Sequence, residues 1–149
     1  MNIFLNKKIL IYGLGKTGFS ALEFLKNKSE IFLYDDHLSK LKNLGIRNTV
    51  SYKNLLKLNF DQIILSPGID IDKCKLSKFL KRNHNKIYSD LDVFYSFNKN
   101  DCITITGTNG KSTTCQLMYE VLLNQKLDAR LVGNIGNPIL SVKNFKKKT

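Results

Sequence analysis

The hydrophobic pattern of the first hundred residues alternates between strand-like and helix-like periods. Four short apolar runs, at residues 7–12, 31–34, 61–65 and 86–88, have the length and composition of buried strands, and residues 48–52 are a weaker candidate. Helical spacing is found at residues 19–25, 37–44, 53–58 and 73–82. Because strands that alternate with helices form parallel sheets, residues 1–97 are predicted to be an α/β domain of Rossmann-like type.

A polar stretch at residues 97–101 separates this unit from a second one. Residues 103–106 and 129–132 are predicted strands, and residues 115–123 have the pattern of a helix. Residues 98–149 are therefore expected to be the incomplete start of a P-loop-type α/β domain. An incomplete parallel sheet exposes an apolar edge and face, so we expect aggregation or disorder beyond about Cys102.

A glycine-rich loop follows the first predicted strand directly. Gly13, Gly15 and Gly18 fit G-x-G-x-x-G, and Asp35 ends the next strand twenty residues after Gly15. This is the dinucleotide fingerprint, in which the acidic residue accepts from a ribose hydroxyl. Two alternatives stay open at this point: an NAD-dependent redox or sensing module, and a plain glycine turn that joins strand to helix.

A second glycine loop, GTNGKST at residues 107–113, precedes the helical pattern of the second unit. Gly107 and Gly110 let the backbone approach a phosphate, Lys111 adds a mobile positive charge, and Ser112 offers a hydroxyl suited to Mg²⁺. The general P-loop would have its first glycine at Ile105. The stretch is therefore either a variant nucleotide site or a glycine turn with a chance lysine.

Composition narrows the class of protein. The net charge of +12, from 24 Lys and Arg against 12 Asp and Glu, suits anionic nucleotides. The lysines are spread along the chain with no recognition module, so we do not expect nucleic-acid binding. No apolar run approaches the roughly 18 residues of a membrane span. Three widely spaced cysteines indicate neither a disulfide framework nor a zinc site and favour the cytoplasm.

Several polar residues are expected to have structural roles only. His37 and His84 have no neighbours that indicate catalysis or metal binding, so both are predicted to lie on the surface. Asp90 and Asp92 follow Ser89 in the pattern of a helix cap with acid in its first turn.

Four loops stand in a fixed order along the chain: GLGKTG at 13–18, SPG at 66–68, GTNGKST at 107–113 and GNIG at 133–136. Together they resemble the Mur ligases. GTNGK alone indicates only the superfamily, whereas the four loops in combination are similar to the branch that joins D-glutamate to UDP-N-acetylmuramoyl-L-alanine. The resemblance covers essentially the whole chain, but only the amino-terminal third of such an enzyme.

The resemblance implies a first domain that holds the UDP part of the substrate. Gly15, Lys16 and Thr17 would lie by the pyrophosphate and Asp35 near the uracil. The remaining implied substrate contacts are Ser66, Pro67 and Gly68 in the nucleotide pocket and Asn134 at the muramoyl-alanine end. The implied ATP and Mg²⁺ site comprises Gly107, Thr108, Asn109, Gly110, Lys111, Ser112 and Thr113, with Lys111 catalytic and Ser112 at the metal.

The implied reaction is ATP-driven amide formation through an acyl phosphate. The implied enzyme is a cytoplasmic monomer of peptidoglycan precursor synthesis. Members of the family carry a metal-binding glutamate, a modified lysine and a histidine later in the central domain, and a third domain for the amino acid. None of these lies in the 149 residues, so the chain alone is expected to have no ligase activity.

Overall fold

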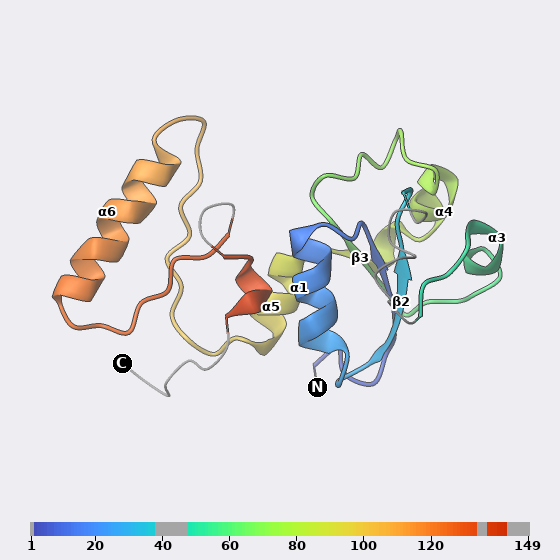
Figure 1. Ribbon diagram of the computed structural model, residues 1–149, viewed down its shortest axis with the longest axis horizontal. Helices are drawn as coiled ribbons and strands as arrows, with labels where there is room; N and C mark the ends of the chain where they lie inside the picture. The colour runs from blue at the N-terminus through green and yellow to red at the C-terminus, as the bar shows by residue number, and fades with distance from the viewer. Residues whose placement is uncertain (1, 38–47, 134–136, 143–149) are drawn as a thin grey trace.

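The computed structural model describes residues 2–37, 48–133 and 137–142. Figure 1 shows a sheet with its helices at one end of the molecule and a single long helix at the other. The helices and strands are, in chain order, β1 (Lys8–Tyr12), α1 (Lys16–Leu25), β2 (Glu30–Tyr34), α3 (Tyr52–Leu55), β3 (Gln62–Leu65), α4 (Ser77–Arg82), η2 (His84–Lys86), β4 (Ile87–Tyr88), α5 (Asp90–Phe97), α6 (Lys111–Asn124) and η3 (Ile139–Ser141).

The sheet has four parallel strands in the order β2-β1-β3-β4. The predicted Rossmann-like α/β fold is therefore confirmed. The chain builds outward from β1 in both directions, with β2 on one side and β3 on the other. Parallel sheets bind ligands where the strand order reverses, at the carboxyl ends of the strands. In this sheet that point lies just after β1.

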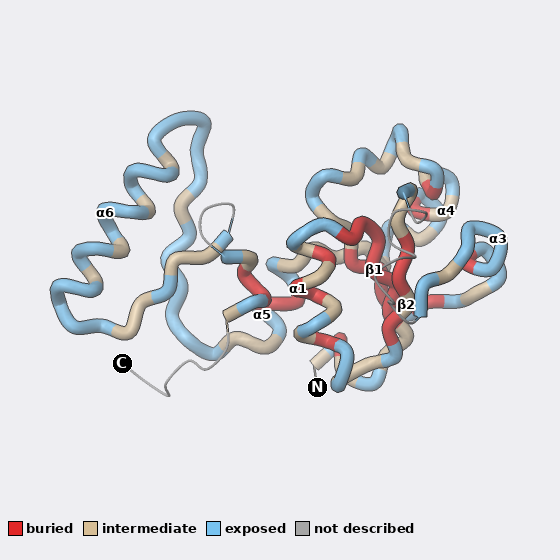
Figure 2. The backbone as a smooth tube through the Cα atoms, in the orientation of Figure 1, coloured by how far each residue is buried: buried red, intermediate tan, exposed pale blue. Residues whose placement is uncertain are grey.

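Both faces of the sheet are covered, which explains why its strands are apolar throughout. Ile9 and Ile11 of β1 belong to a core that includes α1 and α5, whereas Leu10 and Tyr12 belong to a second core with α3 and α4. Successive side chains of a strand point to opposite faces of the sheet, so β1 contributes residues to both cores. Figure 2 shows β1 and β2 as the most continuously buried part of the tube.

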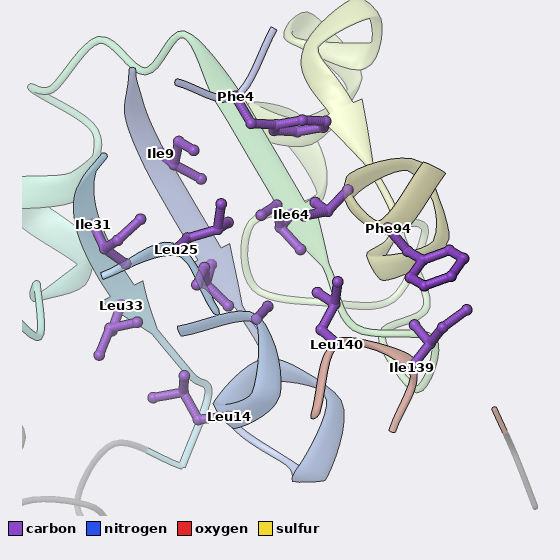
Figure 3. Close-up of a cluster of buried hydrophobic side chains, with 13 residues drawn as sticks. Phe4, Ile9, Leu14, Leu25, Ile31, Leu33, Ile64, Phe94, Ile139 and Leu140 are labelled. Carbon is purple, nitrogen blue, oxygen red and sulfur yellow. The ribbon is translucent and has the colours of Figure 1, made fainter. Parts of the chain in front are cut away.

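A segment from the end of the chain completes the first of these cores. Ile139 and Leu140 of η3 are only 8% and 4% exposed and belong to the same cluster as Phe94 of α5 and Leu14 (Figure 3). The chain thus leaves the first unit after α5, forms α6, and returns.

In the second unit the predicted helix is present and the predicted strands are not. The predicted helix at 115–123 lies within α6. The predicted strand at 103–106 is wrong: no strand is assigned there, and Ile103 is 62% exposed. The predicted strand at 129–132 is wrong as well, since only Val132 forms a bridge, to Asn137. Backbone groups need a neighbouring strand to form a ladder, and none lies beside residues 103–106 in the described part of the chain.

Three smaller differences concern the first unit. The candidate strand at 48–52 is reduced to a single bridge between Thr49 and Leu33. The helix predicted at 73–82 begins only at Ser77, because turns on Asp70 occupy the residues before it. The helix predicted at 37–44 falls almost wholly outside the described residues.

The start of α5 is as predicted. Ser89 Oγ accepts a hydrogen bond from Asp92 N–H, and the Asp92 carboxylate accepts one from Ser89 N–H, which completes a capping box. His37 and His84 are both exposed, as expected. In the described part of the chain no helix has the length and apolar character needed to cross a membrane.

Candidate functional site

The glycine loop after β1 depends on close backbone packing. Gly13 has a φ of +94°, a conformation that L side chains rarely adopt. A Cβ on Gly18 would lie 1.9 Å from the carbonyl oxygen of Gly13. The loop can therefore fold back onto α1 only with glycine at both positions.

Ser66 joins this loop to the one after β3. Its hydroxyl donates to the Gly13 carbonyl at 2.7 Å, and its backbone N–H donates to the Tyr12 carbonyl at 3.0 Å. Pro67 and Gly68 follow in exposed positions. The GLGKTG and SPG motifs, fifty residues apart in sequence, thus meet at the carboxyl ends of neighbouring strands.

Asp35 binds the backbone of the glycine loop. Its Oδ2 accepts from Leu14 N–H at 2.7 Å, and its Oδ1 accepts from His37 N–H at 2.8 Å. Sequence reasoning did not anticipate this, because it assigned the carboxylate only to a ligand. Each carboxylate oxygen can accept a second hydrogen bond, so Asp35 can order the loop and still face a ligand.

Sequence analysis missed a partly buried polar cluster beside Asp35. The Tyr12 hydroxyl donates to Asp36 Oδ2 at 2.9 Å, and Lys75 Nζ donates to the Asp36 carbonyl at 3.1 Å. Burial, with Cys74 and Asp36 beside the phenol, holds the pKa of Tyr12 far above its usual value. Burial and the nearby Asp36 charge raise the pKa of Tyr34 to about 12. Two adjacent acidic residues at the end of β2 were the available signal.

One carboxylate oxygen of Asp36 lacks a hydrogen-bond donor in the described part of the chain. Its Oδ1 is buried and has no hydrogen-bond partner among the described residues. Burying a carboxylate oxygen without a hydrogen-bond donor costs free energy. The cluster therefore depends on the hydrogen bond that the Tyr12 hydroxyl donates to the other oxygen.

A groove of about 1340 Å³ begins at the glycine loop and runs between α1, α5 and residues 137–142. Gly15 and Lys16 lie at one end, and Asn137 and Pro138 line it from the returning segment. Its wall also carries aromatic rings, with Lys28 Nζ 4.2 Å from the centre of the Phe24 ring. Positive charge next to apolar surface suits a ligand with both phosphate and uncharged parts.

The second glycine loop forms the amino-terminal end of α6. Gly110 is the N-cap with a φ of +74°, and Gly107 has a φ of +147°. Lys111 Nζ donates to the Thr108 carbonyl at 3.0 Å and to the Gly107 carbonyl, so its ammonium lies across the loop. Thr108, Asn109, Ser112 and Thr113 are exposed. The uncapped first turn of α6 leaves its N–H groups directed at the loop, as anion binding requires.

The residues fit Mg²⁺ only in part. The Ser112 hydroxyl is exposed and can serve as one oxygen ligand. Within residues 2–37, 48–133 and 137–142, no group of three or more His, Cys, Asp or Glu could hold a metal ion. Phosphate oxygens and water would have to supply the rest of the coordination.

The predicted site residues therefore fall into two groups. Gly15, Lys16, Thr17, Asp35 and 66–68 gather at the carboxyl ends of β1, β2 and β3, while residues 107–113 form the loop before α6 and its first turn. Of these residues only Gly15 and Lys16 line the groove. Asn134 lies outside the described residues.

Residues 7–87 match the family model described as Mur ligase MurD-like, N-terminal domain. The chain belongs to this family. The matched region includes both the glycine loop and Ser66, and ends within β4. The expected resemblance to the Mur ligases is thereby confirmed for the first unit.

Curated relatives extend the similarity through the second unit. A protein of Rickettsia prowazekii named UDP-N-acetylmuramoylalanine–D-glutamate ligase is 39% identical over 96% of this chain and 33% of its own length. Proteins of the same name from Lachnoclostridium phytofermentans and Wolbachia pipientis are 35% and 32% identical, over 91% and 95% of this chain. This MurD-like chain spans about one third of the length of these relatives.

Proposed function

We propose that this chain carries the substrate-binding domain, residues 1–97, and part of the ATP-binding domain, residues 98–149, of a peptidoglycan ligase. The ligase would add D-glutamate to UDP-N-acetylmuramoyl-L-alanine. The observation that carries the proposal is the contact between the two loops that follow β1 and β3. The Ser66 hydroxyl donates to the Gly13 carbonyl there, and the groove begins beside them at Lys16. A cytoplasmic location is part of the proposal and is supported by three free thiols.

The first unit would bind the UDP moiety. The exposed backbone of Gly15, the amino-terminal end of α1 and the Lys16 ammonium together suit a pyrophosphate, with Thr17 beside it. Asp35, which already orders Leu14, would lie near the uracil. Ser66, Pro67 and Gly68 would complete the nucleotide pocket, and Asn134 would contact the muramoyl-alanine end.

The second unit would bind ATP. The backbone of residues 107–113 would surround the phosphates, and the exposed Ser112 hydroxyl would supply one ligand to Mg²⁺, which neutralises charge on the phosphate oxygens when bound. The Lys111 ammonium, held by two loop carbonyls, would turn to the γ-phosphoryl oxygens and stabilise the charge that develops there. The catalytic role of Lys111 rests on this reorientation.

In the proposed reaction the substrate carboxylate attacks the γ-phosphorus of ATP and releases ADP. The resulting acyl phosphate is attacked by the amine of D-glutamate, which loses a proton and displaces phosphate to form the amide. Since the chain spans a third of its relatives, we expect the isolated 149 residues to bind the UDP-sugar without turnover. D-glutamate-dependent ADP release from the purified chain would contradict this expectation.

Calorimetric titration tests the binding role directly. We expect UDP-N-acetylmuramoyl-L-alanine to bind the chain and NADH not to bind. Lys16→Ala should weaken binding of the UDP-sugar, whereas Lys57→Ala, which removes the same charge from an exposed position outside the groove, should not. Binding of NADH alone would overturn the ligase proposal in favour of an NAD module.

A further inference from the structure

The returning segment is the most deeply buried attachment of the second unit to the first in the described part of the chain. Of the described residues after Phe97, only Ile139 and Leu140 are buried, and the half-buried Val132 packs against the same core. They belong to the core formed by α1, α5 and one face of the sheet, where Ile139 lies beside Phe94 and Leu140 points toward the sheet (Figure 3).

Ile139 and Leu140, here called the anchor, lie within a short turn that is closed by two hydrogen bonds. Ser141 N–H donates to the Pro138 carbonyl at 2.9 Å, and the Ser141 hydroxyl donates to the same oxygen at 2.7 Å. Pro138 fixes the backbone immediately before Ile139. The two buried side chains therefore determine the position of the residues directly upstream.

Those upstream residues lie at the groove. Asn137 and Pro138 line it together with Gly15 and Lys16, and Ile139 and Leu140 form the adjoining part of its wall. Asn137 also contacts the chain before it: its carbonyl oxygen accepts from Gly133 N–H, and it forms a bridge with Val132. Residues 137–140 thus join the core of the first unit to the part of the second unit that lines the groove.

We propose that Ile139 and Leu140 are positioning residues for UDP-sugar recognition. By packing against α1 and α5 they hold Asn137 over the groove, so that the sugar-peptide part of the ligand contacts the second unit while Gly15 and Lys16 contact its pyrophosphate. This inference rests on the proposed function and assigns different parts of the ligand to different parts of the chain. UDP alone depends on the glycine loop, and the extra affinity of the sugar-peptide depends on the anchor.

The experiment compares two ligands across core variants. The dissociation constants of UDP and of UDP-N-acetylmuramoyl-L-alanine are measured by calorimetry on the full 149-residue chain. Leu140→Ala should weaken binding of the UDP-sugar about tenfold and binding of UDP less than twofold. Leu140→Met, which keeps the volume, should restore binding of the UDP-sugar.

A matched control separates positioning from general loss of stability. Leu25 is fully buried in the same core but lies at the far end of α1 and does not line the groove. Leu25→Ala should lower the midpoint of urea unfolding and leave the ratio of the two dissociation constants unchanged. If Leu140→Ala fails to fold, the smaller truncation Leu140→Val should show the same selective change at reduced size.

The outcomes distinguish the two proposals. A selective loss of UDP-sugar affinity supports the anchor. Equal weakening of both ligands, or no change in either, overturns the inference and leaves the proposed function in place. Failure of the wild-type chain to bind either ligand overturns the proposed function, and the inference with it.

Discussion

At the residue scale, two glycines of the first loop differ in what an added methyl group would meet. A Cβ on Gly18 would collide with the Gly13 carbonyl, whereas a Cβ on Gly15 would meet nothing within 4 Å. We expect Gly18→Ala to lower the free energy of unfolding by about 2 kcal/mol or more, and Gly15→Ala, at the N-cap of α1, by about 1 kcal/mol or less. Urea unfolding of both variants checks this, and similar losses would contradict the packing argument.

The tyrosines beside Asp36 predict a loss of stability at alkaline pH. Burial raises the pKa of Tyr34 to about 12, and it shifts the pKa of Tyr12 in the same direction. A raised folded-state pKa contributes stability that is complete below the unfolded pKa and lost as pH rises through the folded pKa. The free energy of unfolding should therefore fall between pH of about 10 and 12.

Denaturant unfolding across that pH range, with tyrosinate absorbance as a second readout, measures the effect. Tyr34→Phe should flatten the alkaline loss, because the variant has one fewer shifted phenol. Tyr52→Phe is the control, since Tyr52 is an exposed tyrosine outside the buried core. Equal alkaline behaviour of the two variants would count against the role assigned to Tyr34.

Some residues of the candidate site could be predicted from the sequence, whereas the contacts between them could not. Gly13, Gly18 and Asp35 were found because a spacing rule links them, and the structure brings them together. The bond from Asp35 to Leu14 N–H and the pair of Tyr12 with Asp36 were not found. Both depend on the register of β1 against β2, which a single sequence does not contain.

At the scale of elements, the capping box of α5 predicts a measurable contribution from one hydroxyl. Ser89→Ala removes the acceptor for Asp92 N–H and the partner of the Asp92 carboxylate. We expect a loss of about 1 kcal/mol in the free energy of unfolding, and Ser89→Thr should retain most of it. Urea unfolding is again the measurement, and an unchanged midpoint for Ser89→Ala would contradict the capping role.

The elements themselves show where sequence patterns suffice. β1, β2 and β3 were predicted to within a few residues because each is buried on both faces and bounded by polar residues or glycine. The run at 103–106 has a similar composition and forms no strand. A β pattern describes a side-chain preference, and a strand also needs a neighbour for its backbone hydrogen bonds.

At the scale of the whole molecule, α6 is the longest helix in the described part of the chain, and it contributes no residue to either core. None of its residues is buried, and Figure 2 shows it exposed along most of its length. Leu117, Met118 and Val121 lie on one face, whereas Gln116 and Glu120 form a hydrogen-bonded pair on another. A helix that exposes several apolar side chains is more stable when they are covered.

The last prediction follows from that exposed face. Exposed apolar patches promote association, so we expect the isolated chain to self-associate as its concentration rises and to bind a hydrophobic dye. Val121→Lys, which places a charge on the apolar face, should reduce both effects. Gln116→Lys adds the same charge to the polar face and should change neither appreciably. Analytical ultracentrifugation with dye titration provides the comparison. If the two lysine variants behave alike, net charge rather than the apolar face governs association. A wild-type chain that stays monomeric without binding dye would show that the face of α6 is covered within the chain itself.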